Sequence, residues 1–276
     1  MRVVKAHAYG NDFLLVPAAD VARDGDRAAL ARRLCERHRG IGADGVIFHR
    51  PTESGAVMDL LNADGSYSEL SGNGVRCLAA CVARERETDV GASIVIETDA
   101  GPKVLELLGV DGVRLTFRTA IGQPEAVSQR SIAIDGGFVD TVTMRVGNPQ
   151  CVVLGEVSSE RLHGLAGRLA VHPAFPAGTN VELAAVEAPD RVRILIWERG
   201  VGPTEASGTG ACAAAVAAIA YGGAARDVQV VAPGGTQRVE WRDEGLYLTG
   251  WAEVLVEGRV PGSPLSTANS QLSTPK

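Results

Sequence analysis

The chain has 276 residues, of which 45% are hydrophobic, 22% charged and 4% aromatic, and its formal net charge is -6. The length suggests one large domain or two of about 130 residues each. The acidic balance, without a run of Lys or Arg longer than a pair, argues against a nucleic-acid partner. No stretch has the roughly 18 apolar residues of a membrane span, and the N-terminus lacks the apolar core of a signal peptide. We therefore expect a cytoplasmic protein that has no membrane partner.

The predicted elements are short β-branched strands separated by Gly, Pro, Asn and Asp turns. The N-terminal segment is expected to be a strand, and the helical period of residues 27–39 predicts a helix that Gly40 ends. Two further helices are predicted over 72–86 and 208–221. The second is small or apolar almost all round, so it should be buried on every side. Residues 263–276 are polar and rich in Ser, Thr and Pro, which is typical of a mobile tail.

A duplication relates the two halves of the chain. The motif SGNG at 71–74 recurs as SGTG at 207–210, 136 positions further on, and GN at 10–11 recurs at 147–148. Such landmarks in the same order at nearly the same offset indicate two homologous halves. The predicted fold is α/β, with two pseudo-symmetric domains over 1–120 and 121–262, each a mixed sheet wrapped around a central helix.

Cysteine and histidine give no sign of a metal site. The five cysteines are odd in number and dispersed, without a CxxC pair, so neither a disulfide framework nor a zinc site is expected. The five histidines show no ligand spacing. The residues in question are Cys35, Cys77, Cys81, Cys151 and Cys212, and His7, His38, His49, His163 and His172.

Each repeated motif places a serine and two glycines at the start of a predicted helix. We call residues 71–74 the first mouth and residues 207–210 the second mouth. Helix N-termini attract anions through their unpaired N–H groups, although Ser71 and Ser207 are equally suited to be plain N-caps. A pseudo-twofold axis would bring both mouths to one carboxylate, with the serines on opposite faces of the neighbouring carbon. That arrangement predicts an isomerase that inverts a stereocentre with two bases.

Eight motifs resemble those of the diaminopimelate epimerases over nearly the whole chain. They are GNDF (10–13), GIGADG (40–45), NADGS (62–66), SGNGVRC (71–77), VGNP (146–149), TNVE (179–182), ERGVG (198–202) and SGTGACAAAV (207–216). The resemblance implies a pyridoxal-phosphate-independent enzyme without a cofactor, usually a homodimer. It also implies interconversion of LL- and meso-diaminopimelate, a small-molecule amino-acid substrate of lysine and peptidoglycan synthesis.

The resemblance also implies roles for single residues. The amino and carboxylate groups at the non-reacting end would be held by Asn11, Asn62, Asn148, Asn180 and Arg199. Gly72 with Asn73, and Gly208 with Thr209, would hold the reacting carboxylate, and Glu198 would tune a catalytic group or bind the ammonium. Asn62 and Asn180 are alternatively turn residues, and Glu198 with Arg199 is alternatively a surface ion pair.

The chain departs from the family at its acid and base groups. Ser71 and Ser207 occupy the positions of the two catalytic cysteines, and Gln150 replaces a histidine. A helix N-terminus can turn a thiol, whose pKa is near 8.5, into a resting thiolate. A serine hydroxyl stays protonated unless a separate base takes its proton. Glu198 is the obvious base for one serine, so two-base epimerisation is expected to be weak or absent.

Three interpretations remain open. The chain is a diaminopimelate epimerase whose cysteines were replaced deliberately, although Gln150 counts against this. Alternatively, it is a natural relative with other chemistry or another amino acid as substrate, or a non-catalytic amino-acid-binding protein. Proline racemases and hydroxyproline epimerases carry a different signature after the first catalytic residue, so the GNG of the first mouth disfavours them.

Overall fold

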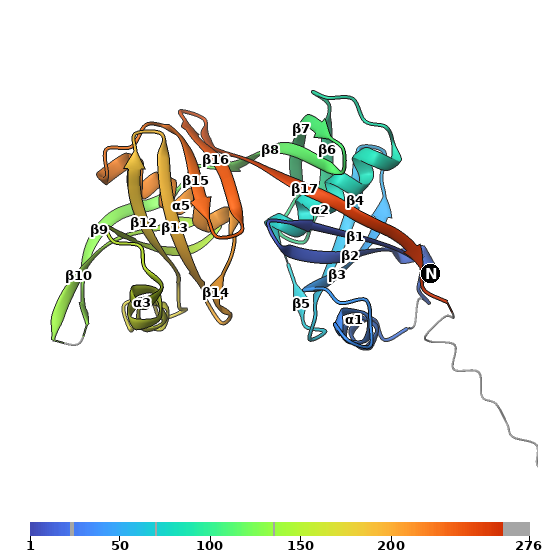
Figure 1. Ribbon diagram of the computed structural model, residues 1–276, viewed down its shortest axis with the longest axis horizontal. Helices are drawn as coiled ribbons and strands as arrows, with labels where there is room; N and C mark the ends of the chain where they lie inside the picture. Colours follow the sequence, from blue (N-terminus) through green and yellow to red (C-terminus); the bar gives the residue numbers. More distant parts are fainter. Residues whose placement is uncertain (23–24, 70, 135, 262–276) are drawn as a thin grey trace, which may run out of the picture.

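The structure is a computed structural model that describes residues 1–22, 25–69, 71–134 and 136–261 (Figure 1). The predicted tail at 263–276 lies outside the described residues. Two lobes lie side by side, and long strands join them.

The elements of the first lobe are β1 (Arg2–Ala8), β2 (Asn11–Pro17), η1 (Ala18–Asp20), α1 (Arg27–Cys35), β3 (Gly45–Pro51), β4 (Gly55–Asn62), β5 (Tyr67–Ser68), α2 (Gly72–Glu85), β6 (Ser93–Glu97), β7 (Lys103–Asp111) and β8 (Arg114–Gly122). Those that follow are β9 (Glu125–Ile134), β10 (Gly137–Val146), β11 (Asn148–Leu154), α3 (Ser159–Arg161), the π-helical turn η2 (Leu162–Ala166), α4 (Gly167–Ala170), β12 (Asn180–Ala188), β13 (Arg191–Glu198), β14 (Gly202–Thr204), α5 (Gly208–Tyr221), β15 (Asp227–Ala232), β16 (Gly235–Arg242) and β17 (Gly245–Arg259).

The two lobes repeat one pattern of strand pairing. In the first, β2 runs parallel to β3 with Phe13 opposite Gly45, and β3 runs antiparallel to β4. In the second, β11 runs parallel to β12 with Gln150 opposite Asn180, and β12 runs antiparallel to β13. Each lobe therefore has a mixed sheet of the same local topology, which confirms the predicted α/β class.

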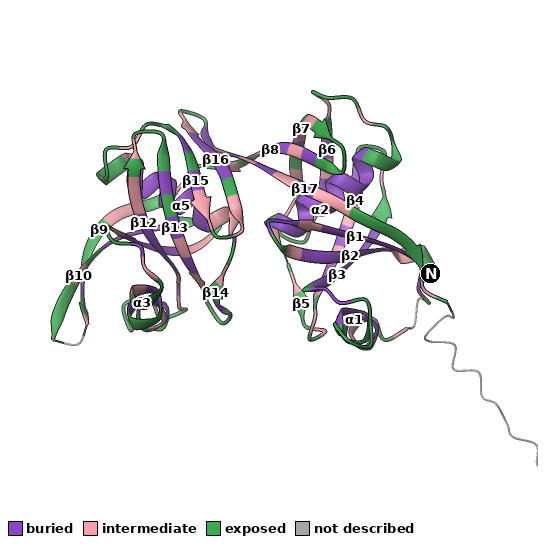
Figure 2. Cartoon of the chain, viewed as in Figure 1, coloured by how far each residue is buried: buried purple, intermediate pink, exposed green. Residues whose placement is uncertain are grey.

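One helix lies inside each sheet, as Figure 2 shows by its burial colours. The helix α2 is buried from Asn73 to Ala83, and α5 is buried from Gly210 to Ala218. The alanines of α5 pack against β-branched and aliphatic residues of the surrounding strands. Because small side chains let a helix approach a sheet closely on all sides, the composition of residues 208–221 dictates this central position.

The strand β17 connects the lobes. Its first part pairs with β16, where Thr249 is opposite Arg238, and its last part pairs with β1, where Arg259 is opposite Arg2. Residues Leu246 to Glu253 of β17 also pair with β8, so this pairing overlaps both of the others. The end of β17 thus belongs to the sheet of the first lobe, and the division at residue 120 stays a prediction.

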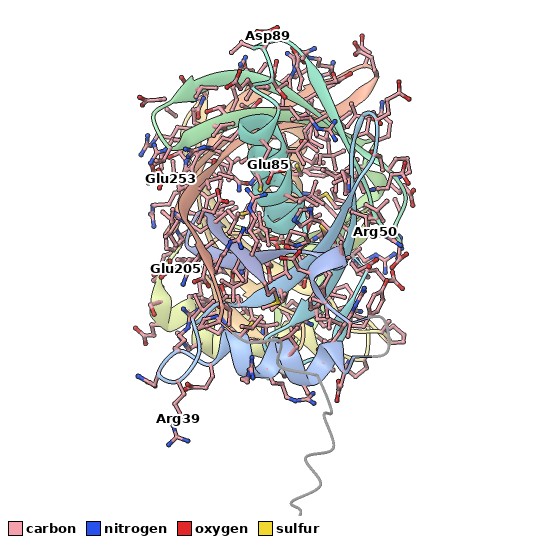
Figure 3. All side chains as sticks on the ribbon, turned by 90° about the vertical axis from the view of Figure 1, so that its right-hand side faces the viewer. Arg39, Arg50, Glu85, Asp89, Glu205 and Glu253 are labelled. Carbon is pink, nitrogen blue, oxygen red and sulfur yellow. The ribbon has the colours of Figure 1, made fainter. Side chains whose placement is uncertain are left out.

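The helix predicted over 27–39 ends earlier, at Cys35. Asp26 caps its start by accepting the N–H of Ala29 at 2.9 Å. At the other end Glu36 adopts an extended backbone, with ψ of 123°, and its carboxylate accepts the N–H groups of His38 and Arg39. The Arg39 side chain points away from the protein (Figure 3). Local bonds from the Glu36 carboxylate replace helical bonds here, which periodicity alone does not reveal.

Candidate functional site

Both repeated serines cap a helix. The Oγ of Ser71 accepts the N–H of Gly74 at 3.1 Å at the start of α2. The Oγ of Ser207 accepts the N–H of Gly210 at 3.2 Å at the start of α5. Both serines are partly exposed. Each hydroxyl is thus held at a helix N-terminus, where an anion is stabilised.

The two helices contact each other across the lobes. The buried guanidinium of Arg76 lies beside this contact and donates to Oδ1 of Asn73 at 3.1 Å. It lies over the ring of Tyr9, 5.7 Å from the ring centroid. Burial lowers the pKa of Arg76. Burial also raises the pKa values of the Cys77 and Cys212 thiols, and the positive charge of Arg76 offsets part of that rise. The charge of the guanidinium therefore reaches one cysteine in each central helix, Cys77 of α2 and Cys212 of α5.

A chain of polar contacts holds the asparagines of the first mouth. Asn73 donates to Oδ1 of Asn11 at 3.4 Å, and Asn11 donates to Oδ2 of Asp44 at 2.8 Å. Arg37 in turn donates to Oδ1 of Asp44 at 2.8 Å. A carboxylate only accepts hydrogen bonds, so Asp44 fixes which end of the Asn11 amide faces Asn73. Sequence reasoning gave Asp44 no role, although it belongs to the GIGADG motif.

A second set of amides lies in the other lobe. The buried Gln150 donates to Oδ1 of Asn148 at 2.6 Å and is opposite Asn180 in the parallel pair of β11 and β12. Oδ1 of Asn180 accepts the backbone N–H of Arg199 at 2.9 Å. Asn180 therefore holds the backbone at position 199.

Arg199 and Asn62 lie at more exposed positions. The Arg199 guanidinium donates to the carbonyl of Ala177 at 2.5 Å, and no ion pair joins it to a carboxylate within the described ranges. Asn62 is exposed and donates to Oγ of Ser66 at 2.9 Å, as in a turn. No ion pair joins Glu198 and Arg199 among the described residues, and the role of Asn62, in a turn or in substrate binding, stays a prediction.

Two carboxyl groups lie beside the second mouth. Burial raises the pKa of Glu198, and the nearby Ser207 side chain lowers it in part. Glu182 is fully buried, and neither of its oxygens has a hydrogen-bond partner among the described residues. Burial, followed by the charge of Glu198, raises the pKa of Glu182 well above its ordinary value. Glu182 stands in the TNVE motif, but its burial could not be read from that motif.

The described residues contain no cluster of three or more His, Cys, Asp or Glu side chains that could hold a metal ion. The five cysteines are all unpaired and buried. No helix in the described part of the chain is long and apolar enough to cross a membrane.

Comparison with known sequences identifies the family. The profile of the diaminopimelate epimerases matches residues 3–125 and 142–255. The chain belongs to the diaminopimelate epimerase family. A diaminopimelate epimerase of Desulforudis audaxviator is 40% identical, covering 94% of this chain and 99% of the relative. One from Heliobacterium modesticaldum is 37% identical, with coverage of 95% and 100%.

Solved structures share the fold at low sequence identity. A protein of Pseudomonas aeruginosa described as a predicted epimerase has a TM-score of 0.71 and 16% identity, over 95% of this chain and 99% of its own. A hydroxyproline epimerase of Agrobacterium vitis with bound trans-4-hydroxy-L-proline has a TM-score of 0.67 and 15% identity, over 94% and 90%. The expected family resemblance and epimerase fold are therefore confirmed, and the chain is a diaminopimelate epimerase-like isomerase.

Proposed function

We propose that this protein binds diaminopimelate between its two helix mouths and interconverts the LL and meso forms without a cofactor, at a rate limited by the serines. One observation carries this proposal: Ser71 and Ser207 occupy the same N-cap position of two helices that contact each other across the lobes. The names of the relatives supply the substrate.

The reacting carboxylate is placed at the first turns of α2 and α5. Gly72 and Gly208 keep these turns open to an anion, and the N–H groups of Asn73 and Thr209 add donors. A Cβ added to Gly72 would meet no atom within 4 Å, so the position in front of the first mouth is open. Arg76 donates to Asn73 in the first mouth, and its charge also reaches Cys212 of α5, so it favours a bound carboxylate and the charge that develops on it.

The non-reacting end is assigned to Asn11, Asn62, Asn148, Asn180 and Arg199. Arg199 presents a planar set of donors suited to a carboxylate, and among the described residues its guanidinium donates only to the carbonyl of Ala177. The ordered amides of Asn11 and Asn180 supply oriented carbonyl and N–H groups for the distal ammonium and carboxylate. The exposed Asn62 has its amide bonded to Ser66, so binding requires this side chain to exchange partners.

Proton transfer is the slow step in this proposal. A serine hydroxyl has no resting anion at neutral pH, so it removes a proton only when a base receives its own. We assign this purpose to Glu198 for Ser207, because the Ser207 side chain influences the pKa of Glu198. A chain with Cys at both positions would start from a thiolate at a helix N-terminus and is expected to react faster.

The assembly and location are part of the same proposal. A homodimer in the cytoplasm fits the habit of the family and the acidic, ordinary composition of the chain. Size-exclusion chromatography with light scattering tests the dimer, which predicts a mass of about twice 28.8 kDa.

The test of the function is proton NMR of LL-diaminopimelate in deuterated water. We compare the protein with its Ser71→Cys, Ser207→Cys double variant. Slow loss of the Cα signal with the protein and faster loss with the double variant are expected. If neither exchanges the Cα proton while the substrate still binds, the isomerase activity is contradicted.

A second candidate is an amino-acid-binding protein without catalysis. The observation that favours it is the complete capping geometry of both serines, which holds each hydroxyl in a structural bond. Calorimetric binding of LL-diaminopimelate, with no exchange of its Cα proton, would support this candidate. A natural relative with another substrate would instead exchange the Cα proton of a different amino acid in the same NMR measurement.

A further inference from the structure

The turn between β1 and β2 holds a tyrosine in an unusual backbone conformation. Tyr9 and Gly10 are the two residues between the strands, and their φ angles are 56° and 88°. A turn with two positive φ angles favours Gly, Asn or Asp, and a bulky residue rarely adopts it. Only 1% of the Tyr9 surface is exposed. The packing around its side chain must therefore stabilise this conformation.

The second lobe and the connecting strand supply that packing. The hydroxyl of Tyr9 donates to the carbonyl of Thr236 in β16 at 3.1 Å and accepts the backbone N–H of Trp251 in β17 at 3.2 Å. The centroids of the Tyr9 and Trp251 rings are 4.3 Å apart. Both hydrogen-bonding functions of the phenol are thus satisfied. The turn of the first lobe is anchored to β16 of the second lobe and to the strand that joins the lobes.

Three glycines make room for Tyr9. A Cβ added to Gly234 would lie 2.6 Å from the carbonyl oxygen of Tyr9, and one added to Gly235 would lie 2.8 Å from Cδ1 of its ring. A Cβ added to Gly250 would lie 2.9 Å from its hydroxyl oxygen. Contacts this short exclude a side chain, so these glycines permit the close approach. We call residues 234, 235 and 250 the Tyr9 socket.

Arg76 connects the socket to the first mouth. A Cβ added to Gly250 would also lie 3.0 Å from Cζ of Arg76, whose guanidinium lies over the Tyr9 ring. Arg76 donates to Oδ1 of Asn73 at 3.1 Å, and Asn73 donates to Oδ1 of Asn11 at 3.4 Å. A guanidinium can only donate, so it bonds the oxygen of the Asn73 amide and turns the amide nitrogen toward Asn11.

The socket also contacts the segment that leads into the second mouth. The N–H of Gly234 donates to the carbonyl of Glu205 at 2.9 Å. Ala206 directly precedes Ser207 and packs in the same hydrophobic cluster as Tyr9, which is the core around α2. Tyr9 therefore lies where the second mouth and the first lobe are in contact.

The repeated GN motif has no tyrosine before it in the second lobe, where Val146 precedes Gly147. A Cβ added to Gly147 would meet no atom within 4 Å, whereas one added to Gly10 would lie 3.1 Å from Oε2 of Glu205. The turn of the first lobe thus packs against the second lobe, and the equivalent glycine of the second lobe is open. The contact through Tyr9 is one-sided.

We propose that Tyr9 and Arg76 are positioning residues, which transmit the placement of the second lobe to the amides of Asn11 and Asn73 at the first mouth. Packed side chains and hydrogen bonds form a continuous path from the socket to these amides, as coupling between distant groups requires. The part that the amides play in substrate binding rests on the proposed function. Their coupling to the second lobe does not depend on it.

Asparagine-selective ¹⁵N labelling tests the coupling without substrate. The chain has six asparagines, at positions 11, 62, 73, 148, 180 and 269. The labelled protein therefore gives six pairs of side-chain amide signals in NMR, and replacing each asparagine by aspartate in turn assigns its pair. The first five are the asparagines that the proposed function assigns to the substrate.

Two variants disturb the start of the path, and one serves as the control. Tyr9→Phe removes both hydrogen bonds of the hydroxyl and keeps the ring. Gly250→Ala places a methyl group against Tyr9 and Arg76. Gly258→Ala is the matched control, because Gly258 is also in β17 and a Cβ there would meet no atom within 4 Å.

The expected result is a selective movement of signals. Tyr9→Phe and Gly250→Ala should move the side-chain amide signals of Asn11 and Asn73 and leave those of Asn148 and Asn180 in place. Gly258→Ala should move none of them. Unmoved signals of Asn11 and Asn73 in Tyr9→Phe overturn the proposal. Equal movement of all signals overturns it as well, since it indicates a general loss of structure. If Gly250→Ala does not fold, Tyr9→Phe decides the question alone.

Calorimetry with LL-diaminopimelate separates this inference from the proposed function. At a temperature at which both proteins are fully folded, Tyr9→Phe should bind about three- to tenfold more weakly than the parent, and Gly258→Ala should bind equally well. A purely structural role would lower the stability of Tyr9→Phe and leave its Kd unchanged, which overturns the positioning role. If the parent does not bind while the signals of Asn11 and Asn73 move as expected, the proposed substrate is refuted and the coupling stands.

Discussion

Glu182 lies directly against Gly210: a Cβ at position 210 would stand 2.7 Å from Oε1 of the Glu182 carboxyl. The same Cβ would lie 3.2 Å from Oγ of Ser207. The glycine therefore lets a buried carboxyl pack beneath the capping serine, and any side chain at 210 must displace one of them.

Gly210→Ala is expected to destabilise the protein relative to Gly74→Ala. Both glycines occupy the third position of a central helix, so the gain in helix propensity from alanine is the same at both. At 74 the neighbour is the flexible end of Ile47 at 3.1 Å, whereas at 210 it is a fully buried carboxyl. Urea unfolding should show Gly210→Ala to be less stable than Gly74→Ala by about 1–3 kcal/mol. Equal stability would mean that Glu182 can move aside freely.

The second prediction concerns the contribution of the two serine caps to stability. Each Oγ accepts one N–H of the first turn, and sulfur is a weaker acceptor than oxygen. Ser71→Cys and Ser207→Cys should each lower the free energy of unfolding by about 0.5–1 kcal/mol, and the corresponding alanine variants by about 1 kcal/mol. Urea denaturation curves measure this difference. Cysteine variants as stable as the parent would contradict a stabilising role of the serine hydroxyls as caps. The serines at positions 71 and 207 would then matter for activity alone.

Much of the fold was accessible from the sequence because it depends on local composition. The small, apolar stretch 208–221 predicted α5 at its observed bounds, and the repeated SGNG and SGTG motifs predicted two lobes with one central helix each. The end of α1 was not accessible, since Glu36 bonds locally to the following turn instead of continuing the helix. The two carboxyl residues of the site differ in the same respect: one was accessible from the sequence and the environment of the other was not. Glu198 stands in a recognisable motif, but the burial of Glu182 results from the pairing of β12 with β11 and β13, which no local pattern contains.

The buried carboxyl of Glu182 predicts a pH dependence of stability. Its pKa in the folded protein is raised well above the ordinary value, mainly by burial. The folded protein therefore binds this proton more tightly than the unfolded chain. The contribution to stability is full below the unfolded pKa of about 4.3 and is lost as the pH rises from there toward the folded pKa.

Glu182→Gln removes this loss, so the variant should gain stability relative to the parent between pH 5 and pH 8. Urea unfolding at both pH values measures the gain. The control is Glu187→Gln, because hydrogen bonds with Arg193 and Arg191 lower the pKa of Glu187. Its carboxylate contributes stability above the unfolded pKa, so this substitution should be unfavourable or neutral at pH 8. A pH-independent difference for Glu182→Gln would contradict a protonated buried carboxyl.

The last prediction concerns Arg199 and the distal end of the substrate. Within the described part of the chain its guanidinium has one partner, the carbonyl of Ala177, and it still offers the two N–H groups that a bidentate contact with a carboxylate needs. Arg199→Gln should weaken binding of LL-diaminopimelate by about 10- to 100-fold in calorimetry, which corresponds to about 1.4–2.8 kcal/mol.

L-lysine is the matched ligand, because it has the distal amino group but no distal carboxylate, and its weaker binding should not change with Arg199→Gln. Arg161→Gln is the matched protein control. Arg161 donates in the same way to a backbone carbonyl, that of Glu156 at 2.7 Å, and lies outside both mouths. If Arg199→Gln weakens lysine and diaminopimelate equally, Arg199 acts by holding the backbone around Ala177, and the distal carboxylate must be bound by the asparagines alone.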